Sequence, residues 1–84
     1  MHTVYVLKSS KDNNLYIGCT SNINHRLDYH NKGKVKSTKS RRPLKLVYKE
    51  NYDSIYKAFQ IERYYKTAKG KNELRVKLAL SSNG

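Results

Sequence analysis

The hydrophobic and polar positions of the chain predict two short strands near its N-terminus. Residues 3–9 and 15–20 are both rich in β-branched and aromatic residues, which is typical of strands. Residues 11–14 between them read Lys-Asp-Asn-Asn, and Asp and Asn favour turns because their side chains hydrogen-bond the nearby backbone. We therefore predict an antiparallel hairpin.

The next segment has the pattern of a helix over residues 23–32. Ile23 and Leu27 recur at the i, i+4 spacing of one helical face. Ser21 or Asn22 can cap its N-terminus, and Gly33 supplies a residue that tolerates the left-handed conformation after the last turn.

The second half of the chain predicts one more strand and two more helices. Residues 44–48 follow Pro43 and form the third strand. Asp53 and Ser54 cap a second helix that we expect to end at Gly70. A short third helix covers residues 72–80. This order predicts an α+β fold with a three-stranded antiparallel sheet flanked by about three helices.

Length and composition limit the class of protein. The chain has 84 residues, of which 37% are hydrophobic, so we expect one domain over residues 1–80 and a flexible tail at 81–84. It lacks the run of about 18 apolar residues that a membrane span needs and has no recognisable secretory leader. With Cys19 as its one cysteine, these features predict a cytoplasmic protein.

The charge is strongly positive and concentrated in the middle of the chain. Lys and Arg number 18 against six Asp and Glu, a net charge of +12, and residues 31–50 hold eight of the basic side chains and one acidic one. A solvated loop that maintains solubility is one interpretation, and an acidic membrane surface is another, although no amphipathic apolar face accompanies the run. We favour a nucleic acid, because binding to phosphates releases condensed counterions. The candidate contacts in this run are Lys34, Lys36, Lys39, Arg41 and Arg42.

Two pairs of residues could form a site on the predicted hairpin and first helix. Tyr5 and Tyr16 lie in strands that pair with each other, where cross-strand side chains are about 5 Å apart, although ordinary packing also explains two strand tyrosines. Arg26 and His30 are one helical turn apart beside the apolar stripe. The alternative for this pair is an arginine that reaches solvent beside a surface histidine.

Glu62 occupies an unusual position in the second helix. Ile55, Ala58, Phe59 and Glu62 fall at i, i+3, i+4 and i+7, so that a carboxylate continues the apolar stripe. A partly buried carboxylate is retained when a cation or metal pairs with it. Glu62 is therefore either one side of a salt bridge, to Arg63, Lys66 or Arg26, or a ligand for Mg²⁺.

Taken in order, these motifs resemble the GIY-YIG nuclease superfamily, most closely its small bacterial members. The resemblance extends from residue 3 to about residue 80. It rests on Val-Tyr-Val-Leu at 4–7, Leu-Tyr-Ile-Gly at 15–18, Asn-His-Arg-Leu at 24–27, His-Asn at 30–31, the segment at 36–48, and residues 58–62 with Lys66. Where the family's first motif usually opens with glycine, this chain has Thr3.

The resemblance implies divalent-metal-dependent cleavage of a DNA phosphodiester and assigns a role to each candidate. Tyr5 and Tyr16 match the tyrosines of the two motifs beside the scissile phosphate, and one of them would take the proton of the attacking water. Arg26 matches the arginine that stabilises the transition state, and His30 a polar position that hydrogen-bonds a tyrosine. Glu62 matches the ligand of one Mg²⁺ or Mn²⁺ ion. We expect these five side chains to converge on one site.

Two functions remain open from the sequence. The first is a metal-dependent DNA endonuclease, possibly in DNA repair or recombination, with Lys66 as a further nucleic-acid contact. The second is a nucleic-acid-binding module that keeps the fold without turnover. RNA stays an alternative to DNA, because phosphate contacts alone do not separate the two.

Overall fold

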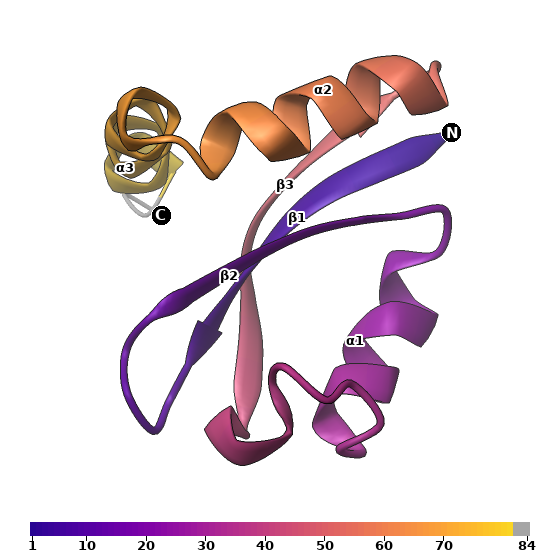
Figure 1. Cartoon of the computed structure of the whole chain (residues 1–84), viewed down its shortest axis with the longest axis vertical. Coiled ribbons are helices and arrows are strands. Elements are labelled where there is room, and N and C mark those ends of the chain that lie inside the picture. The colour runs from indigo at the N-terminus through magenta and orange to yellow at the C-terminus, as the bar shows by residue number, and fades with distance from the viewer. Residues whose placement is uncertain (82–84) are drawn as a thin grey trace.

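The computed structural model describes residues 1–81 and has the α+β architecture that the sequence predicts (Figure 1). A three-stranded antiparallel sheet with strand order β2-β1-β3 lies between α1 on one face and α2 and α3 on the other. In chain order the elements are β1 (His2–Ser9), β2 (Leu15–Thr20), α1 (Ile23–Asn31), the short 3₁₀ helix η1 (Lys39–Arg41), β3 (Leu44–Tyr52), α2 (Ile55–Tyr65) and α3 (Ala68–Ser81).

The central strand β1 is buried on both faces of the sheet. Side chains alternate along a strand, so Val4 and Val6 face α2 and α3, whereas Tyr5 and Leu7 face α1. All four are at most 1% exposed. The strand is therefore a rigid platform from which Tyr5 projects toward α1.

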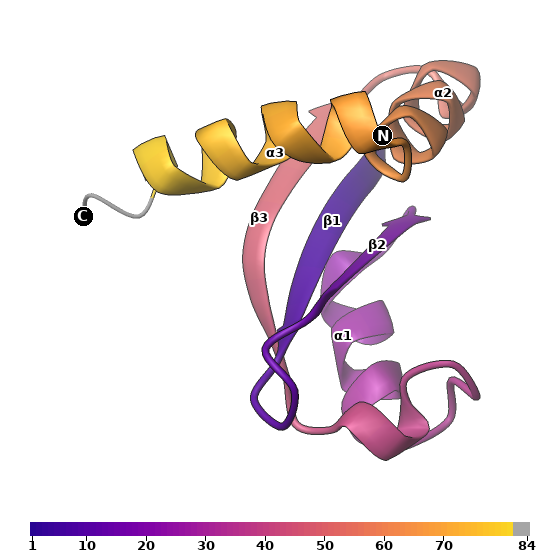
Figure 2. The ribbon, with the colours of Figure 1, turned by 60° about the vertical axis from the view of Figure 1, so that its left-hand side comes forward.

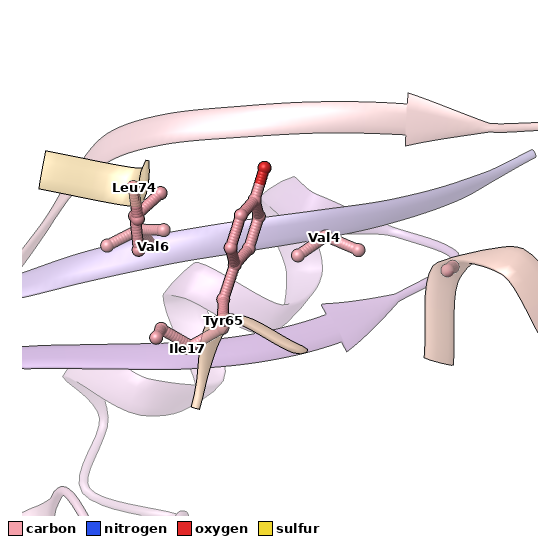
Figure 3. Packing of buried hydrophobic residues seen from close by; sticks show 6 residues of the cluster. Val4, Val6, Ile17, Tyr65 and Leu74 are labelled. Atoms are coloured by element: carbon pink, nitrogen blue, oxygen red, sulfur yellow. The ribbon is translucent and has the colours of Figure 1, made fainter. Parts of the chain in front are cut away.

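Two apolar cores hold the helices on the sheet. The core under α2 and α3 joins the sheet to both of these helices, and Figure 3 labels Val4, Val6, Ile17, Tyr65 and Leu74 among its members. The smaller core under α1 consists of Tyr5, Leu7 and Leu44 with partly buried neighbours from β2 and α1. Each helix is thus fixed by burial of apolar area, the main favourable contribution to folding.

The helix ends follow the capping chemistry of the sequence. Asn22 caps α1, because its side-chain oxygen accepts a hydrogen bond from the His25 N–H at 3.1 Å, and Ser54 caps α2 in the same way. After α1, Gly33 has a φ of 76°, and its N–H bonds the His30 carbonyl. The left-handed glycine stop predicted after the first helix is confirmed.

The boundaries of the second half differ from the prediction. Gly70 does not end α2: the helix stops at Tyr65, and Gly70 lies inside α3. The glycine is needed because a Cβ there would overlap the Tyr64 carbonyl, and Thr67 starts the new helix by accepting from the Gly70 N–H at 3.0 Å. The third helix therefore begins four residues earlier than expected and extends through Ser81.

The third strand and the basic segment also contain more structure than predicted. The strand β3 continues to Tyr52, because Glu50, Asn51 and Tyr52 pair with the first residues of β1. Glu50 also accepts hydrogen bonds from the hydroxyls of Tyr48, Tyr52 and Tyr65. The 3₁₀ helix η1 lies within what was expected to be a loop. Of the predicted tail at 81–84, Ser81 is the last residue of α3, and residues 82–84 lie outside the described residues.

Candidate active site

Tyr5 and Tyr16 lie on the same face of the sheet, on neighbouring strands. In the β1–β2 register Tyr5 is opposite Gly18 and Tyr16 is opposite Leu7, so the two phenols are diagonal neighbours with ring centroids 6.4 Å apart. Gly18 leaves room for the first ring, because a Cβ at this position would overlap the Tyr5 hydroxyl. The glycine that follows Tyr16-Ile17 is therefore required by the packing of Tyr5.

The helix α1 brings Arg26 and His30 to these phenols. The Nε2 atom of His30 lies 3.1 Å from the Tyr5 hydroxyl, and the Arg26 Nε–H donates to the same hydroxyl at 3.4 Å. The His30 ring also meets the Tyr16 ring edge-on, with centroids 5.0 Å apart. His30 is 0% exposed, so the alternative of a surface histidine is wrong. We call Tyr5, Tyr16, Arg26 and His30 the phenol cluster.

Thr38 completes this network, and its role was not predicted. Its Oγ1 atom lies 2.8 Å from His30 Nδ1, and both residues are 0% exposed. No periodic pattern marks Thr38, which lies in the irregular stretch between α1 and η1. The hydrogen bond to His30 gives a buried threonine inside this lysine-rich segment a specific role.

The donor and acceptor capacities of these side chains determine which group donates in each hydrogen bond of the network. Arg26 can only donate, so its Nε–H bonds the Tyr5 oxygen and the Tyr5 O–H is free to donate to His30 Nε2. His30 then carries its proton on Nδ1 and donates it to Thr38, whose own hydroxyl points to the Val35 carbonyl at 3.5 Å. This is the direction in which each hydroxyl proton has an acceptor, and it makes His30 a neutral Nδ1–H tautomer.

The electrostatics of the cluster agree with that assignment. Burial lowers the pKa of His30, and the nearby Arg26 charge lowers it further, which favours neutral imidazole. Burial also raises the pKa of Tyr5 above its ordinary value, although the hydrogen bond from Arg26 acts in the opposite direction. The hydrogen bond to Tyr5 in turn raises the pKa of Arg26. Tyr5 therefore stays a neutral phenol at physiological pH.

Glu62 reaches the same region from the other side of the sheet. It lies on α2, which covers the face opposite α1 (Figure 1). Its charge adds to the effect of burial in raising the pKa of Cys19 on β2, and it also acts in the raising direction, as the weakest of several influences, on the pKa of Tyr5. Because β2 is an edge strand, the two faces meet around it. Four of the five predicted residues thus form one cluster, and Glu62 stands across β2 from them.

The surroundings of Glu62 combine an ion pair with an open surface. The Lys66 Nζ atom lies 2.9 Å from Glu62 Oε2, so one of the salt bridges considered from the sequence is present. The Lys66 side chain is 52% exposed and that of Glu62 is 20% exposed. An ion pair of this kind contributes at most about 1 kcal/mol to the free energy of unfolding. A hollow of about 410 Å³ between Tyr56, Phe59 and Arg63 borders the carboxylate.

The donor set limits what Glu62 could hold. Within residues 1–81 no group of three or more His, Cys, Asp and Glu side chains is placed to bind a metal. A single carboxylate oxygen suits Mg²⁺ or Mn²⁺, because Mg²⁺ commonly keeps several waters and takes one or two carboxylates plus phosphate oxygens. The residues present therefore fit one such ion shared with a phosphate.

The predicted nucleic-acid contacts fall into two groups. Lys34, Lys36, Lys39 and Arg42 are exposed on the segment between α1 and β3, although the Arg42 Nε–H bonds the Lys39 carbonyl at 2.8 Å. Arg41 is partly buried and pairs with Asp12 at 3.1 Å, which ties this segment to the hairpin turn. Lys66 lies apart from them, on the far side of the sheet beside Glu62.

A comparison with known protein families shows to which family the chain belongs. Residues 1–75 match the GIY-YIG catalytic domain, a range that includes every candidate residue. The chain belongs to the GIY-YIG family. The predicted resemblance is confirmed, and the family is one of nucleases.

Relatives of this GIY-YIG chain are similarly small. It is 43% identical over 76 residues to a UPF0213 protein of Staphylococcus haemolyticus, covering 89% of this chain and 92% of that protein. A UPF0213 protein of Bacillus licheniformis is 45% identical over 75 residues, covering 88% and 76% of the two chains.

A solved structure supports the fold. The solution NMR structure of a UPF0213 protein from Bacillus halodurans matches this GIY-YIG chain with a TM-score of 0.55 and 32% identity, over 89% of this chain and 82% of the other. The α+β fold with a three-stranded antiparallel sheet and three helices is therefore confirmed. Within residues 1–81, no helix has the length and apolar character needed to cross a membrane.

Proposed function

We propose that this GIY-YIG chain is an endonuclease that hydrolyses DNA phosphodiester bonds with one Mg²⁺ or Mn²⁺ ion held at Glu62. The observation that carries the proposal is the phenol cluster, in which a guanidinium, a neutral histidine and two phenols meet beside an edge strand, with the Glu62 carboxylate, paired with Lys66, on the other side of that strand. We further expect the enzyme to act in the cytoplasm, possibly in DNA repair or recombination.

Arg26 is the residue that we assign to the scissile phosphate. Its Nε–H is engaged by Tyr5, and a hydrogen bond to the Tyr16 side chain also helps to raise the pKa of Arg26, so both phenols hold the guanidinium beside the position that we assign to the phosphate. A guanidinium is planar and always charged, so it binds phosphate in a bidentate manner and stabilises the extra negative charge of the transition state. Tyr5 and His30 hold the orientation of this group from the sheet and from the helix.

Exposure separates the roles of the two tyrosines. Tyr5 is 1% exposed, and its hydroxyl is occupied by Arg26 and His30. Tyr16 is only half-buried, so it is the phenol that a water molecule can approach, and its side chain is also hydrogen-bonded to Arg26. We therefore assign Tyr16 as the acceptor of the proton from the attacking water, and Tyr5 as a positioning residue for Arg26 and His30.

Glu62 supplies the metal-binding function in this proposal. When bound, a divalent ion acts as a Lewis acid on the phosphate and on the departing 3′ oxygen. The exposed ammonium of Lys66 would move from the carboxylate to a neighbouring phosphate of the DNA. The lysines of the segment between α1 and β3 hold the DNA backbone on the side of α1.

The same ion pair is the observation that favours a second candidate function. If Lys66 holds Glu62 permanently, the chain binds nucleic acid without cleaving it. The two candidate functions predict different effects of Mg²⁺. An endonuclease requires Mg²⁺ for DNA cleavage, whereas Mg²⁺ has no effect on nucleic-acid binding by a module that does not cleave.

A nicking assay with matched variants tests the proposal. Supercoiled plasmid, branched DNA and an RNA duplex are incubated with the protein and Mg²⁺ or EDTA. We expect DNA to be nicked with Mg²⁺ only, and the rate to fall about 100-fold or more in Glu62→Gln and in Arg26→Lys. Glu73→Gln removes an exposed carboxylate of α3 and serves as the control, with unchanged rate. Binding without cleavage in every buffer would support the second candidate instead.

A further inference from the structure

The helices leave part of one sheet face uncovered, on the side opposite the phenol cluster. The helix α2 crosses one end of the sheet, and α3 turns away from it so that its C-terminal half extends beyond the strands (Figure 2). A groove of about 670 Å³ lies between α3 and the hairpin end of the sheet. We call it the hairpin groove.

The walls of the hairpin groove are aliphatic. Ile17 and Val47 contribute from the sheet, and Leu74 and Leu78 contribute from α3. Leu74 and Ile17 are buried, whereas Val47 and Leu78 keep part of their surface exposed. Apolar surface that is collected in a groove, and not scattered singly, indicates a site for another molecule.

The rim of the hairpin groove is cationic. Lys8 at the end of β1 and Lys71 and Arg75 on α3 line it, and none of the described residues in its lining is acidic. Within residues 1–81, none of these three side chains forms an ion pair. A partner that complements this surface places negative charge against the cationic rim and aliphatic side chains against the walls of the groove.

Three classes of occupant differ in how they fit these features. A second copy of the chain carries a net charge of +12 and would oppose three cations with more cations. A nucleic acid would satisfy the rim, but no aromatic ring lines the groove, so its bases would have no stacking surface. An acidic amphipathic peptide places carboxylates on the rim and aliphatic side chains on the walls, as in recognition of a helix in a groove.

We propose that the hairpin groove binds an acidic amphipathic segment of a partner protein. The sheet separates this groove from the phenol cluster, so a partner held there leaves the candidate active site accessible to DNA. Such a surface gives a small catalytic domain a means of recruitment that is independent of its own contacts with DNA.

The test is an NMR titration of ¹⁵N-labelled protein with a synthetic peptide that has leucine at i, i+3, i+4 and i+7 and glutamate at the remaining positions. We expect saturable shifts of the amides of Lys8, Ile17, Lys71 and Leu78. A control peptide with serine in place of leucine should bind at least about tenfold more weakly, because it cannot cover the walls. Equal binding of the two peptides would overturn the proposal, as would an absence of shifts in the groove.

Matched variants and a DNA probe complete the test. Lys71→Glu and Arg75→Glu should each weaken the leucine peptide about fivefold, whereas Lys69→Glu, the same change outside the groove on α3, should leave its affinity unchanged. A single-stranded oligonucleotide should shift residues 32–45 and leave the groove unaffected. If the oligonucleotide displaces the peptide from the groove, the surface is a second nucleic-acid site and the proposal is wrong. These readouts do not involve cleavage, so they are independent of the nuclease proposal.

Discussion

The Tyr5 hydroxyl and the Nε2 atom of His30 lie 3.1 Å apart and join the central strand of the sheet to α1. Both residues are almost completely buried, so this contact belongs to the core under α1 as well as to the candidate active site. The position of Arg26 depends on it, because the guanidinium bonds the same hydroxyl. Changes in the core therefore affect the candidate site through Tyr5.

Replacing Thr38 by valine should weaken the fold and disturb His30. Valine has nearly the same shape but no oxygen, so the buried His30 Nδ1–H would lose its acceptor at a cost of about 1–3 kcal/mol in the free energy of unfolding. Thr38→Ser keeps the hydroxyl and is the matched control. Denaturant unfolding measures the change, and ¹⁵N NMR of the imidazole reports whether wild-type His30 is the Nδ1–H tautomer. An Nε2–H tautomer in the wild type would contradict the assigned direction of the network.

The two tyrosines should respond differently to loss of their hydroxyls. We expect Tyr16→Phe to lower the rate of DNA cleavage about 100-fold or more, because it removes the assigned proton acceptor. Tyr5→Phe should have a smaller effect on the rate and a clear effect on stability, because it breaks one buried and one partly buried hydrogen bond. Single-turnover cleavage and thermal unfolding are measured for both variants. A larger rate loss in Tyr5→Phe would reverse the assignment.

The exposed lysines between α1 and β3 should determine the salt dependence of DNA binding. Replacing Lys36 or Lys39 by glutamine should reduce the slope of log affinity against log salt by about 1, because each phosphate contact releases counterions. Arg41→Gln should change the slope less, because Arg41 is already paired with Asp12. Fluorescence anisotropy at several salt concentrations provides the slopes, and equal slopes for all three variants would contradict this account.

Glu50 should make the stability of the fold depend on pH. Burial alone would raise the pKa of its carboxyl, but hydrogen bonds from three tyrosines and Lys77 outweigh burial and lower the pKa to about 2. A carboxyl whose pKa is depressed on folding contributes stability at pH values above the unfolded pKa, and loses it as the pH falls from about 4.5 to about 2.

We expect Glu50→Gln to cost about 2–3 kcal/mol at pH 7 and much less at pH 2. Urea unfolding across this range measures the difference. Glu73→Gln, which removes a more exposed partner of the same Lys77, is the control and should cost less. A loss of stability in Glu50→Gln that is the same at pH 7 and pH 2 would contradict the linkage.

The sequence was sufficient where local patterns determine structure. The hairpin of β1 and β2, the caps at Asn22 and Ser54 and the stop at Gly33 all follow from short-range chemistry. Spacing paired Tyr5 with Tyr16 and Arg26 with His30, and the resemblance to the GIY-YIG superfamily brought these two pairs together with Glu62 in one predicted site. Thr38 and Glu50 were missed, since each is explained by partners that only the tertiary fold brings together.

Gly70 shows that a glycine in the sequence does not always mark the end of a helix. Glycine is favoured where the chain turns left-handed, but it also allows two backbones to approach closely. Here the second reason applies, because α3 begins against the last turn of α2. No pattern within the sequence distinguishes these two reasons. The position of Glu62 across β2 from the phenols likewise depends on how α2 packs on the sheet.

The central claim is that Glu62 holds a divalent ion at the same DNA phosphate that the phenol cluster contacts. Its most direct test is the addition of Mn²⁺ to ¹⁵N-labelled protein in complex with a nonhydrolysable DNA analogue. The account predicts that amides of α2 around Glu62 and of β2 around Cys19 broaden first, and that Glu62→Gln abolishes this broadening. If the amide signals around Glu50 or Asp28 broaden first, or if Glu62→Gln leaves the pattern of broadening unchanged, the claim is contradicted.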